Sequence, residues 1–94
     1  MTVLADDDVR AELVGLPSWN LLDGTIAAEY RFDDFRQAVA FVVRVAFEAE
    51  ATNHHPDIDV RYNRVRLLLS THSAGGVTAA DLALATVVEG LAGH

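Results

Sequence analysis

The hydrophobic positions of this chain recur with two periods, one helical and one of two residues, and these periods predict its secondary structure. Spacings of three and four residues predict helices over residues 6–16, 35–51 and 79–91. Alternation of apolar and polar residues predicts strands over residues 19–22, 25–32, 58–62 and 65–71. The order helix, hairpin, helix, hairpin, helix predicts an α+β fold in a single domain spanning residues 1–94, with a four-stranded antiparallel sheet and three helices packed mainly on one face.

Short local motifs mark several element boundaries. Asp23-Gly24 accepts the positive φ angles of a two-residue hairpin, and the second hairpin is expected to turn at Asn63-Arg64. Residues 33–34 supply an aspartate that can cap the middle helix. Thr78 and Asp81 have the spacing of a capping box, which predicts the start of the last helix at residue 79.

The same patterns predict which side chains are buried. Trp19 is expected to anchor the core, and Tyr62 is expected to pack within its strand. The last helix is almost entirely apolar, so it is expected to be buried partly against its own sheet and partly against another subunit. An exposed face formed by Leu82, Val87 and Leu91 would serve such an interface.

The composition favours a small domain that associates with other subunits. The chain has 94 residues, of which 51% are hydrophobic. A domain of this length can fold alone, but its core leaves little stability to spare. So high an apolar share in so small a domain therefore favours an apolar subunit interface.

The charge distribution indicates which kinds of partner the protein could bind. The chain carries a formal charge of −7 at pH 7, and its seven basic residues are all arginines, so nucleic-acid binding is disfavoured. Arg61, Arg64 and Arg66 form a local basic cluster, but Asp57 and Asp59 lie beside it in the sequence, which argues against a long phosphate-binding stripe. The cluster is interpreted first as a solvated strand face. An acidic partner or a neighbouring subunit is the alternative.

The cysteine content, the apolar runs and the first residues indicate the cellular compartment. The chain has no cysteine, which excludes disulfides, iron–sulfur clusters and cysteine nucleophiles. No apolar run approaches the length of a membrane span. Residues 1–13 are acidic and lack the basic start and apolar middle of a secretory signal. We therefore expect a soluble cytoplasmic protein that does not engage a membrane.

The candidate chemistry lies in a histidine cluster. His54 and His55 precede Pro56, and His72 follows at the end of the last predicted strand, so these segments hold three of the four histidines. Imidazole can both give and take a proton near neutral pH, and the cluster therefore predicts proton-transfer chemistry. Pro56 prevents a helix through the site and favours an extended His55, which places the pair at a chain reversal. His94 is given no role.

With these motifs placed, the chain resembles the pterin-4a-carbinolamine dehydratase family over nearly its whole length. The matching features are Trp19, Tyr-Arg-Phe-Asp-Asp-Phe at 30–35, Ala-Glu-Ala-Thr-Asn-His-His-Pro at 49–56, Tyr-Asn-Arg-Val at 62–65, Ser-Thr-His at 70–72, and Gly-Gly-Val-Thr at 75–78 with Asp81. The combination is specific, whereas any one of these motifs alone would be weak. Animal members commonly carry an aromatic residue two places after the proline, where this chain has Ile58, and this departure bears on how the pterin ring is packed.

The resemblance implies an enzyme, a hydro-lyase that dehydrates 4a-hydroxytetrahydropterins to quinonoid dihydropterins and so serves tetrahydrobiopterin recycling. The pterin would be the substrate, left by an aromatic amino acid hydroxylase in the same pathway, and no cofactor or metal is implied. The resemblance also implies a homodimer or homotetramer. A non-enzymatic dimerisation or assembly module with the same fold is the alternative.

The resemblance further implies roles for individual residues. His54 and His72 would form the proton-transfer pair, and Glu50 would bond an imidazole or a pterin N–H. Asp81 would orient or polarise His72 or line the pocket. The implied catalytic residues are Glu50, His54, His55 and His72, and the implied substrate-binding residues are His55, Pro56, Thr71 and Asp81.

Structural roles and metal binding are the alternatives for these residues. The imidazoles of His54 and His55 could cap carbonyls at the end of the preceding helix. Glu50 could be a solvated carboxylate, and Asp81 could serve only in the capping box. Three imidazoles and a carboxylate could instead bind zinc or iron, although adjacent histidines in an extended chain point apart.

Overall fold

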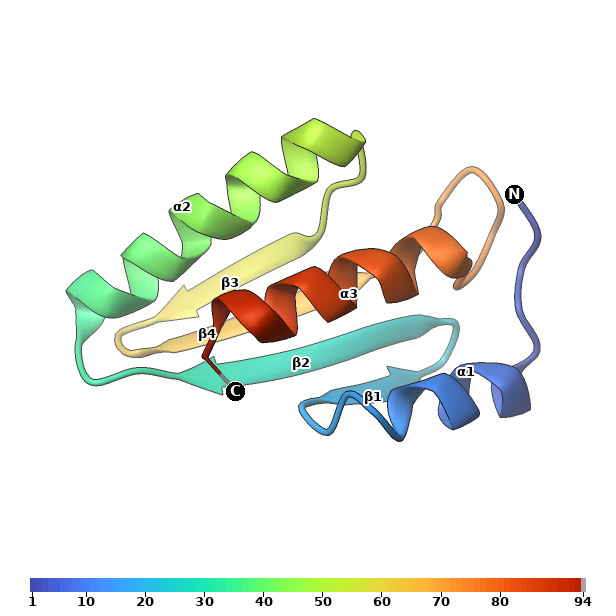
Figure 1. Cartoon of the computed structure of the whole chain (residues 1–94), viewed down its shortest axis with the longest axis horizontal. Coiled ribbons are helices and arrows are strands. Elements are labelled where there is room, and N and C mark those ends of the chain that lie inside the picture. The colour runs from blue at the N-terminus through green and yellow to red at the C-terminus, as the bar shows by residue number, and fades with distance from the viewer. Residues whose placement is uncertain (94) are drawn as a thin grey trace.

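The computed structural model describes residues 1–93 and leaves out His94, so nothing tests the absence of a role for that residue. Within this range the helices are α1 (Asp6–Leu13), α2 (Phe35–Thr52) and α3 (Ala79–Leu91), and the strands are β1 (Trp19–Leu22), β2 (Thr25–Arg31), β3 (Asp57–Arg61) and β4 (Arg64–Leu69). The strands form one antiparallel sheet in the order β1-β2-β4-β3. All three helices lie on the same face of this sheet (Figure 1). The predicted α+β fold is confirmed.

The core lies between the sheet and the helices. Alternate residues of the two central strands point toward the helices, and Ile26, Val65 and Leu67 are fully buried there. From the other side α2 contributes Phe41 and Val45, which are equally buried. Among residues 1–93, no helix lies across the opposite face of the sheet (Figure 1). We call it the open face.

The ends of the two long helices are fixed by specific caps. Asp34 Oδ1 accepts a hydrogen bond from the backbone N–H of Gln37 at 2.9 Å, so Asp34 caps α2. At the other end Asn53 takes a left-handed conformation with φ of 50° and closes the helix. Thr78 and Asp81 form the predicted capping box at the start of α3.

The second hairpin turns one residue earlier than the sequence predicts. Arg61 pairs with Arg64, so the turn consists of Tyr62 and Asn63, not Asn63 and Arg64. The side-chain amide of Asn63 donates to the Phe32 carbonyl at 2.9 Å, and the Phe32 N–H donates back to the Asn63 carbonyl. This exchange ties the turn to the segment before α2. The prediction that Tyr62 packs within a strand is wrong, since its side chain is exposed.

Two further boundaries differ from the predictions by two residues or more. The first helix ends at Leu13 and not at residue 16, because the chain turns at Val14-Gly15. The last strand ends at Leu69, and Thr71 forms only an isolated bridge with Gly76. His72 therefore lies in a turn and not at a strand end.

The exposed apolar surface lies mainly on a different helix from the one predicted. Leu82 and Leu91 of α3 are partly buried against the core, and only Val87 of the three named positions is exposed. On α2, exposed apolar side chains instead recur every four residues. This α2 stripe consists of Phe35, Val39, Val43 and Phe47, which are 54%, 38%, 48% and 74% exposed.

A buried polar network lies beneath α3. Trp19, buried as predicted, donates from Nε1 to the Tyr30 hydroxyl at 2.8 Å, and that hydroxyl donates to Glu89 Oε1 at 2.5 Å. Burial and the neighbouring Glu89 carboxylate raise the pKa of Tyr30, which keeps the phenol protonated as the donor. The network fixes the C-terminal half of α3 to β1 and β2.

Within residues 1–93, no helix combines the length and the apolar character needed to cross a bilayer.

Candidate active site

Two stretches of the chain, residues 50–57 and 70–81, are distant from each other in sequence and meet at one end of the molecule (Figure 1). The C-terminus of α2, the start of β3, the connection that follows β4 and the N-terminus of α3 lie at the same end (Figure 1). The chain reaches this end twice because α2 runs toward it and β4 returns to it. All of the site residues implied by the resemblance lie within residues 50–57 and 70–81.

The end of α2 presents the two adjacent histidines. The backbone N–H groups of Asn53 and His54 donate to the carbonyls of Glu50 and Ala49 at 3.2 and 3.0 Å, which closes the helix. The helix carbonyls are thus capped by backbone groups. The two imidazoles are left free to contact other side chains.

His54 is paired with a carboxylate from the other side of the site. Its Nε2 lies 2.5 Å from Oδ1 of Asp81, on the first turn of α3. The His54 side chain is 16% exposed and the Asp81 side chain is fully buried. An imidazole that pairs with a buried carboxylate while keeping some exposed surface is a common arrangement for a proton-transfer group.

Asp81 is itself held in place by two threonines. Its second oxygen, Oδ2, accepts hydrogen bonds from the Thr71 hydroxyl and from the backbone N–H of Thr78, each at 2.8 Å. The two threonine hydroxyls also lie 2.8 Å apart. An ionised carboxylate only accepts hydrogen bonds, so this arrangement assigns the Nε2 proton of His54 to the Asp81 contact.

His55 pairs with a carboxylate of its own. Its Nε2 lies 2.6 Å from Oε1 of Glu50, which stands on the last turn of α2. The His55 and Glu50 side chains are 53% and 79% exposed, so this pair lies in solvent. Water screens such a contact, which therefore orients the ring more than it stabilises the fold.

His72 stands on the turn between Thr71 and Gly76, and its side chain is exposed. The N–H groups of Ala74 and Gly75 donate to the Thr71 carbonyl at 3.0 and 2.9 Å and close this turn. Because the Thr71 hydroxyl binds Asp81, the turn is attached to the His54 pair. His72 is thus anchored next to the site.

These hydrogen bonds show which of the predicted site residues contact one another. Asp81 contacts His54, whereas the resemblance placed it against His72 or in the pocket. Asp81 has no exposed surface, so in this structure it can act on a substrate only through His54. Thr71 is almost fully buried and supports Asp81, and Pro56 is half-buried beside the two histidines.

The contacts also bear on metal binding. Within the described part of the chain, no three histidine, aspartate or glutamate side chains lie close enough together to hold one ion. His54 and His55 are directed to different carboxylates, in keeping with the divergence expected for adjacent residues. The site therefore presents two separate imidazole–carboxylate pairs.

Sequence reasoning missed the choice of His54 as the partner of Asp81 and the hydrogen bond from the Thr71 hydroxyl, whereas the predicted capping box indicated the support that Thr78 gives to Asp81. The capping-box spacing was the available signal for Thr78, because it places the two residues one turn apart. No sequence signal links His54 to Asp81, which lie 27 residues apart.

Comparison with known proteins identifies the family. The profile of the family described as "Pterin 4 alpha carbinolamine dehydratase" matches residues 2–91. A Chloroflexus aurantiacus protein named "Putative pterin-4-alpha-carbinolamine dehydratase" is 47% identical over 93 residues, which cover 99% of this chain and 100% of that protein. A Gloeobacter violaceus protein named "Putative pterin-4-alpha-carbinolamine dehydratase 2" is 49% identical over 92 residues, which cover 94% of this chain and 100% of that protein.

Solved structures agree with this result. A transcriptional coactivator/pterin dehydratase from Brucella melitensis has a TM-score of 0.92 and 33% identity, with 97% of this chain and 99% of that chain covered. A pterin dehydratase-like protein described as a RuBisCO assembly factor in the alpha-carboxysome has a TM-score of 0.70 and 26% identity, with 81% of this chain and 90% of that chain covered. From the profile match and the full-length relatives, the chain belongs to the pterin-4-alpha-carbinolamine dehydratase family.

Proposed function

We propose that this protein dehydrates 4a-hydroxytetrahydropterins to quinonoid dihydropterins. In this reaction the hydroxyl on C4a accepts a proton and leaves as water, while a ring nitrogen loses a proton. The atoms balance without a redox step, so no metal or further cofactor is needed. The substrate would come from an aromatic amino acid hydroxylase that uses the reduced pterin.

The observation that carries the proposal is the pairing of His54 with Asp81. Because Nε2 faces Asp81, Nδ1 is the ring nitrogen left to exchange a proton with a substrate. A buried carboxylate that accepts a hydrogen bond from one imidazole nitrogen fixes the tautomer and the orientation of the ring. A residue that only packed against the fold would not need this support.

The other two histidines complete the proposed machinery. His72 is the partner of His54 in proton transfer, because its exposed ring sits on a turn attached to Asp81 through Thr71. His55 binds or positions the pterin, with Glu50 orienting its ring.

The direct test is the dehydration rate of a freshly generated 4a-hydroxytetrahydropterin, followed by its ultraviolet absorbance. The intermediate loses water spontaneously, so the measured quantity is acceleration above the rate without protein. We expect the wild-type protein to accelerate the reaction in proportion to its concentration. A folded wild-type protein that leaves the spontaneous rate unchanged would refute the proposal.

A second candidate function is a non-enzymatic assembly module. Two observations favour it: the α2 stripe, and the structural similarity to the protein described as a RuBisCO assembly factor. The α2 stripe has the four-residue repeat with which helices pack ridge into groove. The carboxylate support of His54 favours the enzyme, because a scaffold has no use for an oriented imidazole.

We further infer that the α2 stripe joins copies of this chain into a homodimer or homotetramer. Phe47→Glu places a charge on the most exposed residue of the stripe and is expected to shift the mass in light scattering to that of the monomer. Val14→Glu is the matched control, because Val14 is 82% exposed and lies outside the stripe. A monomeric wild type, or equal effects of both changes, would rule out this interface.

A further inference from the structure

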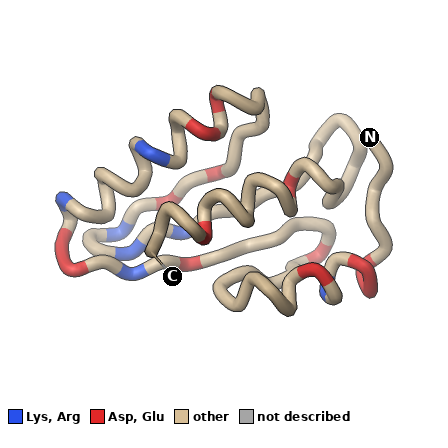
Figure 2. The backbone as a smooth tube through the Cα atoms, in the orientation of Figure 1, with Lys and Arg blue, Asp and Glu red and all other residues tan. Residues whose placement is uncertain are grey.

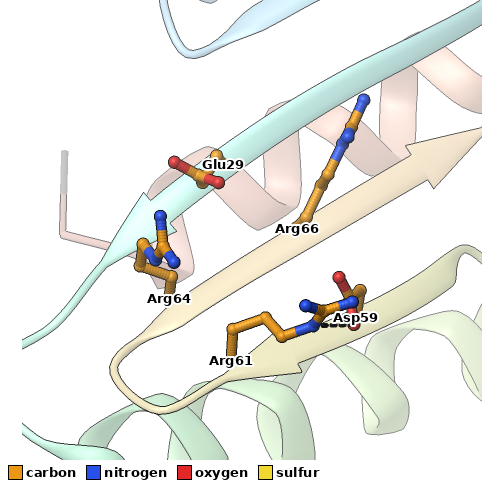
Figure 3. A pocket seen from close by; sticks show the side chains of 5 residues that line it. All are labelled: Glu29, Asp59, Arg61, Arg64 and Arg66. Carbon is orange, nitrogen blue, oxygen red and sulfur yellow. Dashed lines mark hydrogen bonds and ion pairs between the residues drawn. The ribbon is translucent and has the colours of Figure 1, made fainter.

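The open face of the sheet carries a basic surface at the end away from the histidines. Arg31, Arg64 and Arg61 are directly opposite one another on β2, β4 and β3, and we call these three residues the basic row. Side chains of directly paired residues lie on the same face of a sheet. Figure 3 shows that the side chains of Arg61 and Arg64 project from the side of the sheet opposite the helices.

Two of the three arginines of the basic row have no carboxylate partner within residues 1–93. Arg61 Nε lies 3.2 Å from Asp59 Oδ1, but within residues 1–93 neither Arg31 nor Arg64 forms an ion pair. Like charges placed directly opposite one another destabilise a sheet. A face that served only to meet solvent would gain nothing from this arrangement.

The row also stands out against the charge of the whole molecule. The chain carries −7, yet four of its seven arginines lie on the open face: the basic row and Arg66. In Figure 2 most of the arginines gather at the end of the sheet near the β3–β4 turn, whereas α1 at the opposite end is acidic. The four arginines share the open face with Glu29, Asp57 and Asp59, so this face of a negatively charged protein carries one positive charge in excess.

The surface is hollowed, and part of its floor is apolar. A hollow of about 260 Å³ is lined by the side chains labelled in Figure 3: Glu29, Asp59, Arg61, Arg64 and Arg66. Arg66 also lines two neighbouring hollows of about 240 and 320 Å³, to which Leu68 and Ala27 contribute respectively. The three hollows therefore meet at Arg66 and combine cationic and apolar walls.

Tyr62 adds a strained, exposed aromatic side chain beside the row. It follows Arg61 in the turn, has φ of 52° and is 66% exposed. Glycine adopts this conformation without strain, whereas a bulky residue rarely does, and exposure leaves little packing to offset the strain. Strained exposed residues are often found at binding sites, and tyrosine and arginine are enriched among the residues that dominate protein interfaces.

We propose that the open face binds an acidic, partly apolar segment of a partner protein. Carboxylates of that segment would pair with the basic row through the planar arginine guanidinium, which binds them with two parallel hydrogen bonds. Apolar side chains of the same segment would lie over Leu68 and Ala27. The basic row lies at the end of the β3–β4 strand pair opposite to Asp57–Leu68, the pair that borders the proposed dehydratase site.

A protein segment fits this surface better than a nucleic acid does. A phosphate backbone needs a longer run of cations, whereas Asp57 and Asp59 lie beside the row on the same face. The apolar floor would also gain no favourable contact from a chain of phosphates. An acidic segment can place its carboxylates on the arginines and its apolar side chains on the floor.

The test is fluorescence anisotropy of a labelled peptide of glutamate, leucine and alanine, titrated with the full-length protein. The variant Arg31→Ala/Arg64→Ala removes two members of the basic row. The matched control Arg10→Ala/Arg36→Ala changes the net charge equally but removes arginines that pair with Asp7 and Asp34 outside this face. We expect binding that salt weakens, a loss of affinity of about tenfold or more in the first variant, and little change in the control.

Two measurements keep this test decisive. The melting temperature of Arg31→Ala/Arg64→Ala should be unchanged or higher, because the change relieves like-charge repulsion, so weaker binding would not reflect unfolding. An oligothymidylate of the same length serves as the competing probe. Absence of peptide binding, equal losses in both variants, or tighter binding of the oligothymidylate would each overturn the proposal.

Discussion

Replacing His54 by alanine is expected to lower the catalysed dehydration rate by about 10²–10⁴-fold, the usual contribution of a general acid or base. The reason is that the proposed proton passes through Nδ1 of this ring, whose Nε2 is held by Asp81. The rate should be measured at saturating pterin, so that the loss appears in kcat. Because the change leaves the buried Asp81 carboxylate without its imidazole, the assay should be run well below the melting temperature of the variant.

The control for this prediction is His55→Ala. Its imidazole pairs with Glu50 in solvent, so its loss should mainly raise KM and leave the fold unchanged. Added imidazole should restore part of the rate of His54→Ala, which a purely structural role for His54 would not allow. Full activity in His54→Ala would assign the proton transfer to other groups.

Replacing Asp81 by alanine is expected to reduce both stability and turnover. The change removes the acceptor of the Thr78 N–H and one of the two partners of the Thr71 hydroxyl, and a buried donor left without a partner costs about 1–3 kcal/mol. We therefore expect the free energy of unfolding in urea to fall by about 2–4 kcal/mol. Turnover should fall as well, because the His54 ring loses the group that orients it.

A matched control separates this effect from simple loss of charge. Asp6→Ala removes an exposed carboxylate from the first turn of α1 and should change neither property appreciably. Asp81→Asn retains the shape and one acceptor oxygen, so it should recover part of the stability but little of the turnover, since an amide cannot stabilise a protonated imidazole. Wild-type turnover in Asp81→Asn would show that the carboxylate serves only the capping box.

Local patterns predicted most of the fold correctly because neighbouring residues determine them. Asp23-Gly24 turned the first hairpin as expected, since both residues adopt positive φ. The capping box of Thr78 and Asp81 also formed as predicted. The second turn could not be placed from sequence, because Asn63 is held by hydrogen bonds to Phe32 from a segment 31 residues away.

The exposure of the helices was less predictable. The apolar sequence of α3 suggested an exposed face, but Leu82 and Leu91 pack on the core in the folded chain. The exposed stripe is on α2, because this helix has more apolar residues than fit on the face that packs against the sheet. Which apolar residues remain outside depends on how each helix is rotated against the sheet, and this is a property of packing.

The sequence by itself determined the α+β fold, the family resemblance and the histidines at the end of α2, because periodicity, caps and motifs are read along the chain. Only the tertiary structure decided that Asp81 faces His54, that the Thr71 hydroxyl also binds Asp81, and that three arginines align across the open face. These contacts join residues from different elements. They depend on strand register and on how α3 lies against the sheet, which no single segment of the sequence specifies.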